Sequence, residues 1–157
     1  MVPYQILSSK VIRAQPETLF NIIIDYHVHH PAILPKRAFT GLTILEGGHG
    51  VGTVIKVKMK LLGQESTGTI EVIEATPYSR VVEKVIEQKM TTTFLFEPIS
   101  DSETRVTFQT DAEGKSGLAG WFEKLIVPRA LAKVYEEELE QLAVYAAQLE
   151  KTQGKTA

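Results

Sequence analysis

The amino-acid sequence predicts an α+β fold in which a bent antiparallel sheet of seven strands wraps around a long C-terminal helix. Apolar and polar residues alternate between about residues 38 and 112, short turn signals interrupt that pattern, and a helical periodicity follows it. The 157 residues have the length of one domain. We therefore expect a single domain over 1–150 and a disordered polar tail over 151–157.

The chain should begin with one strand and two short helical segments. Residues 6–14 mix β-branched and polar residues, which is typical of a strand. Pro16 suits the first turn of a helix, and Glu17 favours the positive end of the helix dipole, so we expect a helix that ends near Asp25. Prolines interrupt residues 26–35, which predicts an irregular or one-turn helical segment.

Residues 54–61 show the clearest strand pattern. Ile55, Val57 and Met59 alternate with lysines, so one face of this strand should meet the core and the other should meet water. Further turn signals occur at 47–50, 62–64, 76–79, 88–89 and 100–103. Six strands at such short spacing predict an antiparallel meander, and the N-terminal strand makes seven.

The C-terminal part of the chain predicts one long helix. Apolar residues recur at steps of three and four from Trp121 to Leu149, and Pro128 should kink or break the helix near residue 127. This helix is the element with enough apolar length to cover the sheet. A bent sheet around a single helix leaves space that side chains need not fill, so we expect an internal cavity lined mainly by carbon.

Composition excludes several classes of protein. The absence of cysteine excludes disulfides, zinc–thiolate sites, iron–sulfur clusters and cysteine nucleophiles. The net charge of −2 gives no global positive field that would attract nucleic acid. No apolar run approaches the roughly 18 residues of a membrane span, and the N-terminus lacks a secretory signal. We expect a cytoplasmic protein that does not insert into membranes.

Several local patterns resemble one known superfamily in their order and spacing. They are VIRAQPETLF at 11–20 with Asp25, GVGT at 50–53, EATP at 74–77, FLFEP at 94–98, TRVTF at 104–108, and a terminal helix with Leu139 and Leu142. Together they resemble the START-like helix-grip superfamily, in particular its polyketide cyclase/dehydrase and lipid-transport (SRPBCC) branch. The resemblance implies a START-like domain over 1–150, a helix-grip fold and a pocket for a hydrophobic ligand. It carries over no catalytic motif and no cofactor.

The apolar face of the sheet and the start of the long helix supply the candidate ligand-binding residues. Most apolar residues there must form ordinary core, and the resemblance assigns a cavity to a subset of them. Methionine and aromatic side chains would suit an adaptable apolar pocket. The candidates are Ile55, Val57, Met59, Ile70, Val72, Phe94, Phe96, Val106, Phe108, Trp121, Phe122 and Leu125.

A histidine-rich segment, HVHH at 27–30, follows Asp25. Histidine and carboxylate groups can bind metals or transfer protons, but this spacing is not that of a closed zinc site, and we predict no metal. The glycine-rich segment 47–52 joins two strands, which favours a hairpin turn over a phosphate-binding loop. We expect both segments at the mouth of the cavity, and the candidate mouth residues are Tyr26, His29, His30 and His49.

Two groups of charged residues are assigned to the surface. The strand at 81–86 carries Glu83 on one face and Lys84 on the other, so either face brings a charge towards the interior. We expect that charge at the rim of the strand, where it can reach water. The second group is the acidic run Glu136, Glu137, Glu138 and Glu140, which we assign to a solvated helix face.

Three functions remain open at this point. The leading hypothesis is binding, and with it transport or sequestration, of a hydrophobic small molecule such as a lipid, polyketide or aromatic compound. The alternative is an enzyme of the polyketide cyclase/dehydratase type, with acid–base groups drawn from Tyr26, His29, His30 or Glu83. The third is an interaction module with a filled core. The sequence makes no prediction of the oligomeric state.

Overall fold

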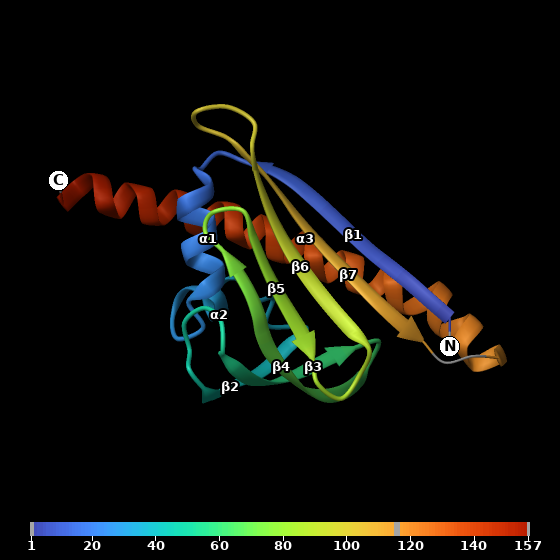
Figure 1. The fold of residues 1–157 in the computed structure, drawn as a ribbon. Helices are drawn as coiled ribbons and strands as arrows, with labels where there is room; N and C mark the ends of the chain where they lie inside the picture. The colour runs from blue at the N-terminus through green and yellow to red at the C-terminus, as the bar shows by residue number, and fades with distance from the viewer. Residues whose placement is uncertain (1, 115–116, 157) are drawn as a thin grey trace.

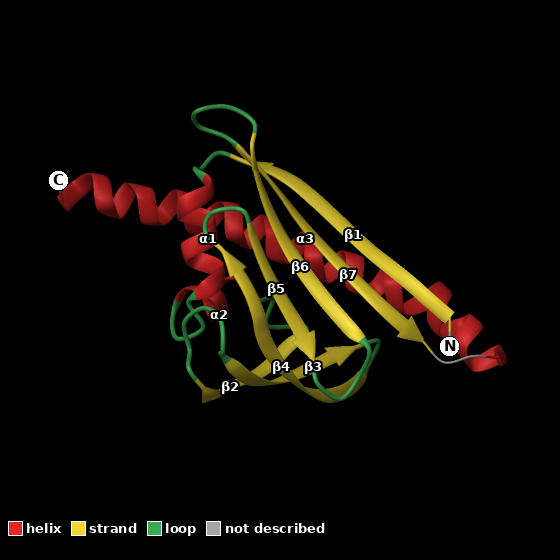
Figure 2. Cartoon of the chain, in the orientation of Figure 1, coloured by secondary structure: helices red, strands yellow, loops and turns green. Residues whose placement is uncertain are grey.

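The computed structural model describes residues 2–114 and 117–156, without the side chains of residues 2, 118–122, 124 and 154–156. The elements in chain order are β1 (Val2–Ile12), α1 (Pro16–Ile24), α2 (His29–Ile33), β2 (Phe39–Glu46), β3 (Val54–Leu61), β4 (Gln64–Thr76), β5 (Arg80–Val85), β6 (Met90–Pro98), β7 (Thr104–Gly114) and α3 (Gly117–Thr156). The predicted α+β class, with two short helices between the first and second strands, is confirmed (Figures 1 and 2).

The seven strands form one antiparallel sheet in the order β1-β7-β6-β5-β4-β3-β2. The strands from β2 to β7 are a meander, and β1 pairs with β7, which leaves β1 and β2 as the two edges. The register shifts between Val72 and Glu74 where β4 pairs with β5, and twice where β2 pairs with β3. Such irregularities bend a strand and increase its twist. The sheet therefore curls at its β2 end, as Figure 1 shows.

The two short helices form as the sequence predicts. Pro16 lies at the start of α1 after the extended Gln15, and the helix buries Leu19 and Ile23 before it ends at Asp25. The segment between the prolines contains α2, a helix of five residues. These two helices pack against α3 and occupy one end of the sheet. They place the residues from Asp25 to His30 next to the concave face.

Helix α3 lies across the concave face and contacts β1, β7, α1 and α2. It buries Leu131, Val134 and Leu142 against the sheet. The sequence predicts a kink or a break near residue 127, and the helix runs through Pro128 without a break. It also continues to Thr156, so the tail expected to be disordered from residue 151 is helical as far as it is described. Within the described part of the chain, no helix has both the length and the apolarity needed to cross a bilayer.

Candidate ligand cavity

A cavity of about 110 Å³ lies between the concave face of the sheet and α3. Its wall is mostly apolar and comes from α2, the segment after it, β2 to β6, and α3. The apolar lining residues are Leu34, Phe39, Leu42, Ile55, Val57, Met59, Ile70, Val85, Met90, Phe94 and Leu131. The polar lining residues are His30, Glu83, Thr92, Tyr135 and Glu138. A concave, apolar space with a few polar groups is typical of a small-molecule site.

A second pocket, of about 160 Å³, continues the cavity towards solvent. It shares Met59, Val85 and Met90 with the cavity and adds exposed residues such as Thr67 and Gln88. These added residues belong to the start of β4 and to the turn between β5 and β6. The opening therefore lies at the start of β4 and at the turn between β5 and β6. The sequence predicts the mouth elsewhere, at the histidine-rich segment 27–30.

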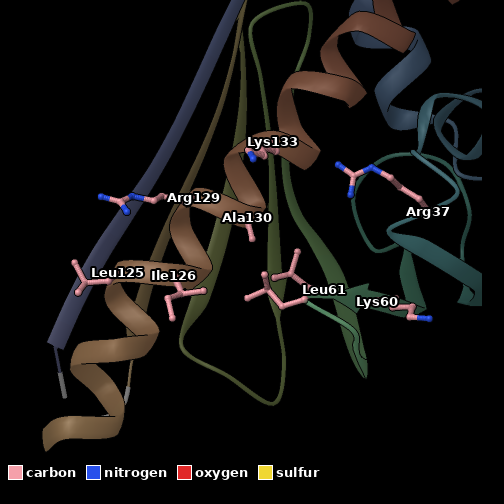
Figure 3. A pocket seen from close by; sticks show the side chains of 9 residues that line it. Arg37, Lys60, Leu61, Leu125, Ile126, Arg129, Ala130 and Lys133 are labelled. Carbon is pink, nitrogen blue, oxygen red and sulfur yellow. The ribbon is translucent and has the colours of Figure 1, made fainter.

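A surface cleft of about 470 Å³ lies beside this opening, between the end of β3 and α3. Figure 3 shows Ile126 on α3 facing Leu61, with cationic side chains around them. The cationic residues of this cleft are Arg37, Lys60, Arg129 and Lys133. None of the four lines the inner cavity. Lysine and arginine side chains thus lie outside the opening and not in the lining of the inner cavity.

The polar groups of the cavity gather at its inner end. The Tyr26 hydroxyl donates a hydrogen bond to Glu83 Oε1 at 2.5 Å. The His30 ring lies against the Tyr26 ring, and His30 Nδ1 donates to the Ile23 carbonyl oxygen at 2.7 Å. This bond directs His30 Nε2 towards Glu138 Oε1, which is 3.6 Å away. The side chains of Tyr26, His30, Glu83 and Glu138 are each at most 9% exposed. Helix α2, strand β5 and helix α3 thus each bring one ionisable group, from His30, Glu83 and Glu138, into the interior.

Burial and mutual contact shift the pKa values of this cluster. Burial raises the pKa of Glu83, because an apolar environment disfavours the charged carboxylate. Burial and the neighbouring Glu83 also hold the pKa of Tyr26 well above its usual value. Burial alone would lower the pKa of His30, but the contact with Glu138 and the nearby Glu83 outweigh it, and the pKa is raised. The inner end of the cavity therefore favours protonated forms.

Tyr135 and two threonines complete the polar end. The Tyr135 hydroxyl is hydrogen-bonded to the Thr110 hydroxyl, and Thr110 Oγ1 lies 2.8 Å from Thr92 Oγ1. Burial raises the pKa of Tyr135 to about 12, so this phenol stays neutral. The arrangement can orient a polar group of a ligand, or exchange a proton with it, while the apolar wall excludes water. Among the described residues, no group of three or more histidine, cysteine or acidic side chains is placed to hold a metal ion.

The candidate ligand-binding residues of the sheet separate into two groups. Ile55, Val57, Met59, Ile70 and Phe94 line the cavity. The others are buried outside its lining, in the core, and they are Val72, Phe96, Val106 and Phe108.

The candidates on the long helix lie elsewhere. Leu125 is 40% exposed and lines the surface cleft rather than the cavity. Its place on α3 is nearly two turns before Leu131, the first residue of this helix in the inner cavity. The side chains of Trp121 and Phe122 lie outside the described residues.

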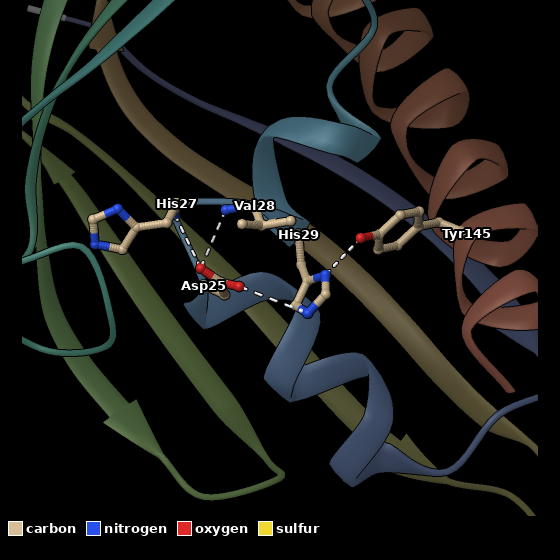
Figure 4. Close-up of polar contacts among 5 residues, drawn as sticks. All are labelled: Asp25, His27, Val28, His29 and Tyr145. Atoms are coloured by element: carbon tan, nitrogen blue, oxygen red, sulfur yellow. Dashed lines mark hydrogen bonds and ion pairs between the residues drawn. The ribbon is translucent and has the colours of Figure 1, made fainter. Parts of the chain in front are cut away.

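The predicted mouth residues are found in three different environments. Tyr26 and His30 are buried at the inner end of the cavity, the reverse of the expected position. His29 faces another way: its Nδ1 is 2.5 Å from the Tyr145 hydroxyl and its Nε2 is 3.7 Å from Asp25 Oδ2 (Figure 4). His49 is exposed, and an isolated backbone bridge joins it to Asp25. Adjacent positions of α2 point to different sides of a short helix, which separates His29 from His30.

Two acidic residues differ from the sequence-based assignment. Glu83 was expected at the rim, and Glu138 on a solvated helix face, but both line the cavity. The spacing of α3 carries the missed signal. Glu138 lies three residues after Tyr135 and four before Leu142, so it shares the buried face of the helix with both. When the acidic run is judged as a whole it looks solvated, and the inward position of Glu138 is missed.

The fold and the cavity together define a helix-grip protein, in which a bent antiparallel sheet holds a long helix around an internal pocket. Residues 5–147 match the family model described as polyketide cyclase/dehydrase and lipid transport. The chain belongs to this family, and the resemblance stated from the sequence is confirmed. A comparison with curated protein sequences finds no match.

Solved structures agree with this assignment. The KanY protein, solved by NMR, is 28% identical, with a TM-score of 0.80 over 94% of this chain and 99% of its own. The ZhuI aromatase/cyclase from Streptomyces sp. R1128 is 11% identical, with a TM-score of 0.76 over 93% and 94%. Norcoclaurine synthase from Thalictrum flavum, bound to a transition-state analogue, is 16% identical, with a TM-score of 0.75 over 95% and 97%. The last two show the shared fold.

Proposed function

We propose that this protein binds a hydrophobic small molecule in the cavity, with the apolar part of the ligand against the sheet and its polar group at the inner end. The observation that carries this proposal is an apolar cavity that is closed by buried ionisable groups at one end and continues to solvent at the other. The interaction-module alternative would need a filled core, and the cavity favours binding over it.

The size of the cavity indicates the size of the ligand. An engineered apolar cavity of about 150 Å³ binds benzene, and the cavity and its outer pocket measure about 110 and 160 Å³. Met59 and Met90 line both spaces, and their unbranched side chains can adapt to a larger molecule. One or two rings, or a short acyl chain, fit these dimensions.

Fluorescence of 2-naphthol, a neutral molecule of two rings, tests the proposal on the native protein. We expect saturable binding that is lost in Met90→Trp, because the indole ring fills the passage between the cavity and the outer pocket. Thr91→Trp is the matched control, since the neighbouring side chain of β6 points to the opposite face and lines a surface depression. Equal binding by both variants, or no binding by the native protein, would contradict the proposal.

A second function, catalysis of a cyclisation or dehydration, is favoured by the buried cluster itself. Two proteins of this fold are named aromatase/cyclase and norcoclaurine synthase. In a dehydration, one group of the cluster would take the proton next to a ketone while another protonates the departing hydroxyl, so that water and an enone form. His30 Nε2 and Glu138 Oε1 lie 3.6 Å apart in the cavity wall, so a substrate that lies beside them would be within reach of both groups.

The enzyme hypothesis has its own test. A β-hydroxy ketone with one phenyl ring is incubated with the protein, and enone formation is followed by absorbance. We expect turnover that His30→Gln abolishes and that His29→Gln, outside the cavity, leaves in place. Equal rates with and without protein would refute the enzyme hypothesis without affecting the binding proposal.

A further inference from the structure

The inner end of the cavity holds more acidic than basic groups. Two carboxyl groups, those of Glu83 and Glu138, face a single imidazole, that of His30. No lysine or arginine is among the residues that line the cavity. The cationic side chains of the surface cleft lie outside the opening. If every group were ionised, this end of the cavity would carry a net negative charge.

Most hydrogen-bond donors of this end are already paired within the protein, and His30 Nε2 faces the Glu138 carboxyl at 3.6 Å. Tyr26 donates to one oxygen of the Glu83 carboxyl, and His30 Nδ1 donates to the Ile23 carbonyl oxygen. The Tyr135 hydroxyl is paired with the Thr110 hydroxyl. The second oxygen of Glu83 has no hydrogen-bond partner among the described residues. This end therefore offers a ligand mainly hydrogen-bond acceptors, the carboxyl oxygens of Glu83 and Glu138.

We propose that the cavity selects a compact apolar molecule that carries an amine and rejects carboxylates and phosphates of the same shape. The inference rests on the proposed binding function and names the class of ligand. An ammonium group neutralises the excess carboxylate and donates charge-assisted hydrogen bonds to it. A carboxylate ligand would instead add a third acidic group to a buried site, where an uncompensated charge is costly.

Protonation couples to this selection. Burial raises the pKa of Glu83, and the titratable groups that face it are Tyr26, His30, Glu138 and Tyr135. An ammonium ligand favours the ionised Glu83 carboxylate, so its binding releases the carboxyl proton to solvent. A neutral alcohol requires no such release. Amine binding should therefore strengthen, relative to alcohol binding, as the pH rises towards the pKa of the amine.

Three probes of one shape test the selection: benzylamine, benzyl alcohol and benzoate. Each is titrated into the native protein at pH 7, and backbone amide NMR shifts give both the dissociation constant and the location. We expect benzylamine to bind about tenfold more tightly than benzyl alcohol, since charge-assisted hydrogen bonds are roughly twice as strong as neutral ones. Benzoate should bind at least about tenfold more weakly than the alcohol.

Variants identify the group responsible. Glu83→Gln keeps the shape of the side chain and removes its ionisation, so the preference for the amine over the alcohol should fall to about one. Glu138→Gln provides a second test if the first variant folds poorly. The matched control is Glu136→Gln, because Glu136 is an exposed acid on the same helix. It should keep the preference of the native protein.

The outcomes distinguish this inference from the function on which it rests. Binding of all three probes with equal affinity, or tighter binding of benzoate, would overturn the amine selection and support the binding function. An unchanged preference in both cavity variants would also overturn it. Failure of all three probes to shift the residues that line the cavity would overturn the binding function itself.

Discussion

Replacement of Tyr26 by phenylalanine tests how the polar end of the cavity is held together. The change removes one hydroxyl from a side chain that is 1% exposed and that donates to Glu83 at 2.5 Å. A buried acceptor that loses its donor costs about 1–3 kcal/mol. The ring still fills its place, so no cavity is created. We expect the free energy of unfolding to fall by about 1–3 kcal/mol.

Urea denaturation at pH 7, followed by circular dichroism, measures this loss. In a thermal melt each kcal/mol should lower Tm by roughly 2–4 °C for a chain of this length. Tyr78→Phe is the control, because Tyr78 is 46% exposed and its hydroxyl has no hydrogen bond among the described residues. If both variants lose the same stability to within about 0.5 kcal/mol, the Tyr26 hydroxyl is not paired as the structure shows.

Three further predictions concern stability. The pKa values of Glu83 and His30 are raised from about 4.5 and 6.5, so between each of these values and the raised pKa the folded state binds more protons than the unfolded state. The free energy of unfolding should therefore fall as pH rises through these windows, and a Glu83→Gln variant whose urea midpoints keep the native pH slope would contradict this. Phe108→Ala should cost about 3–5 kcal/mol in urea unfolding, because Phe108 is fully buried, whereas exposed Leu7→Ala should cost less than about 0.5. Tyr145→Phe removes the partly buried hydrogen bond to His29 and should lower the free energy of unfolding by no more than about 1.5 kcal/mol in the same assay. A larger loss would show that this hydroxyl contributes to stability as a buried group does.

The sequence predicts the sheet well because each strand leaves a local signature. The strand β3 shows the expected alternation of buried and exposed residues, and the turns fall at the predicted glycine, proline and serine positions. The same locality explains the errors. Pro128 lies inside α3 without ending it, since packing on the sheet outweighs the lost hydrogen bond of one proline.

The cavity is harder to predict because it depends on curvature. Val72 and Ile70 lie on the same face of β4, yet only Ile70 lines the cavity. Val72 is fully buried in the core, next to the irregularity between Val72 and Glu74. No local sequence pattern indicates the distance between α3 and each strand. The polar cluster is harder still, since Glu83 and Glu138 are neighbours only after β5 and α3 have packed.

The position of a bound ligand tests the central claim most directly. Intermolecular NOEs between bound 2-naphthol and the methyl groups of the native protein would report which side chains surround it. The account predicts NOEs to Val57, Ile70 and Leu131, which line the cavity. NOEs confined to exposed methyl groups, such as those of Ile73 and Ile86, would contradict it.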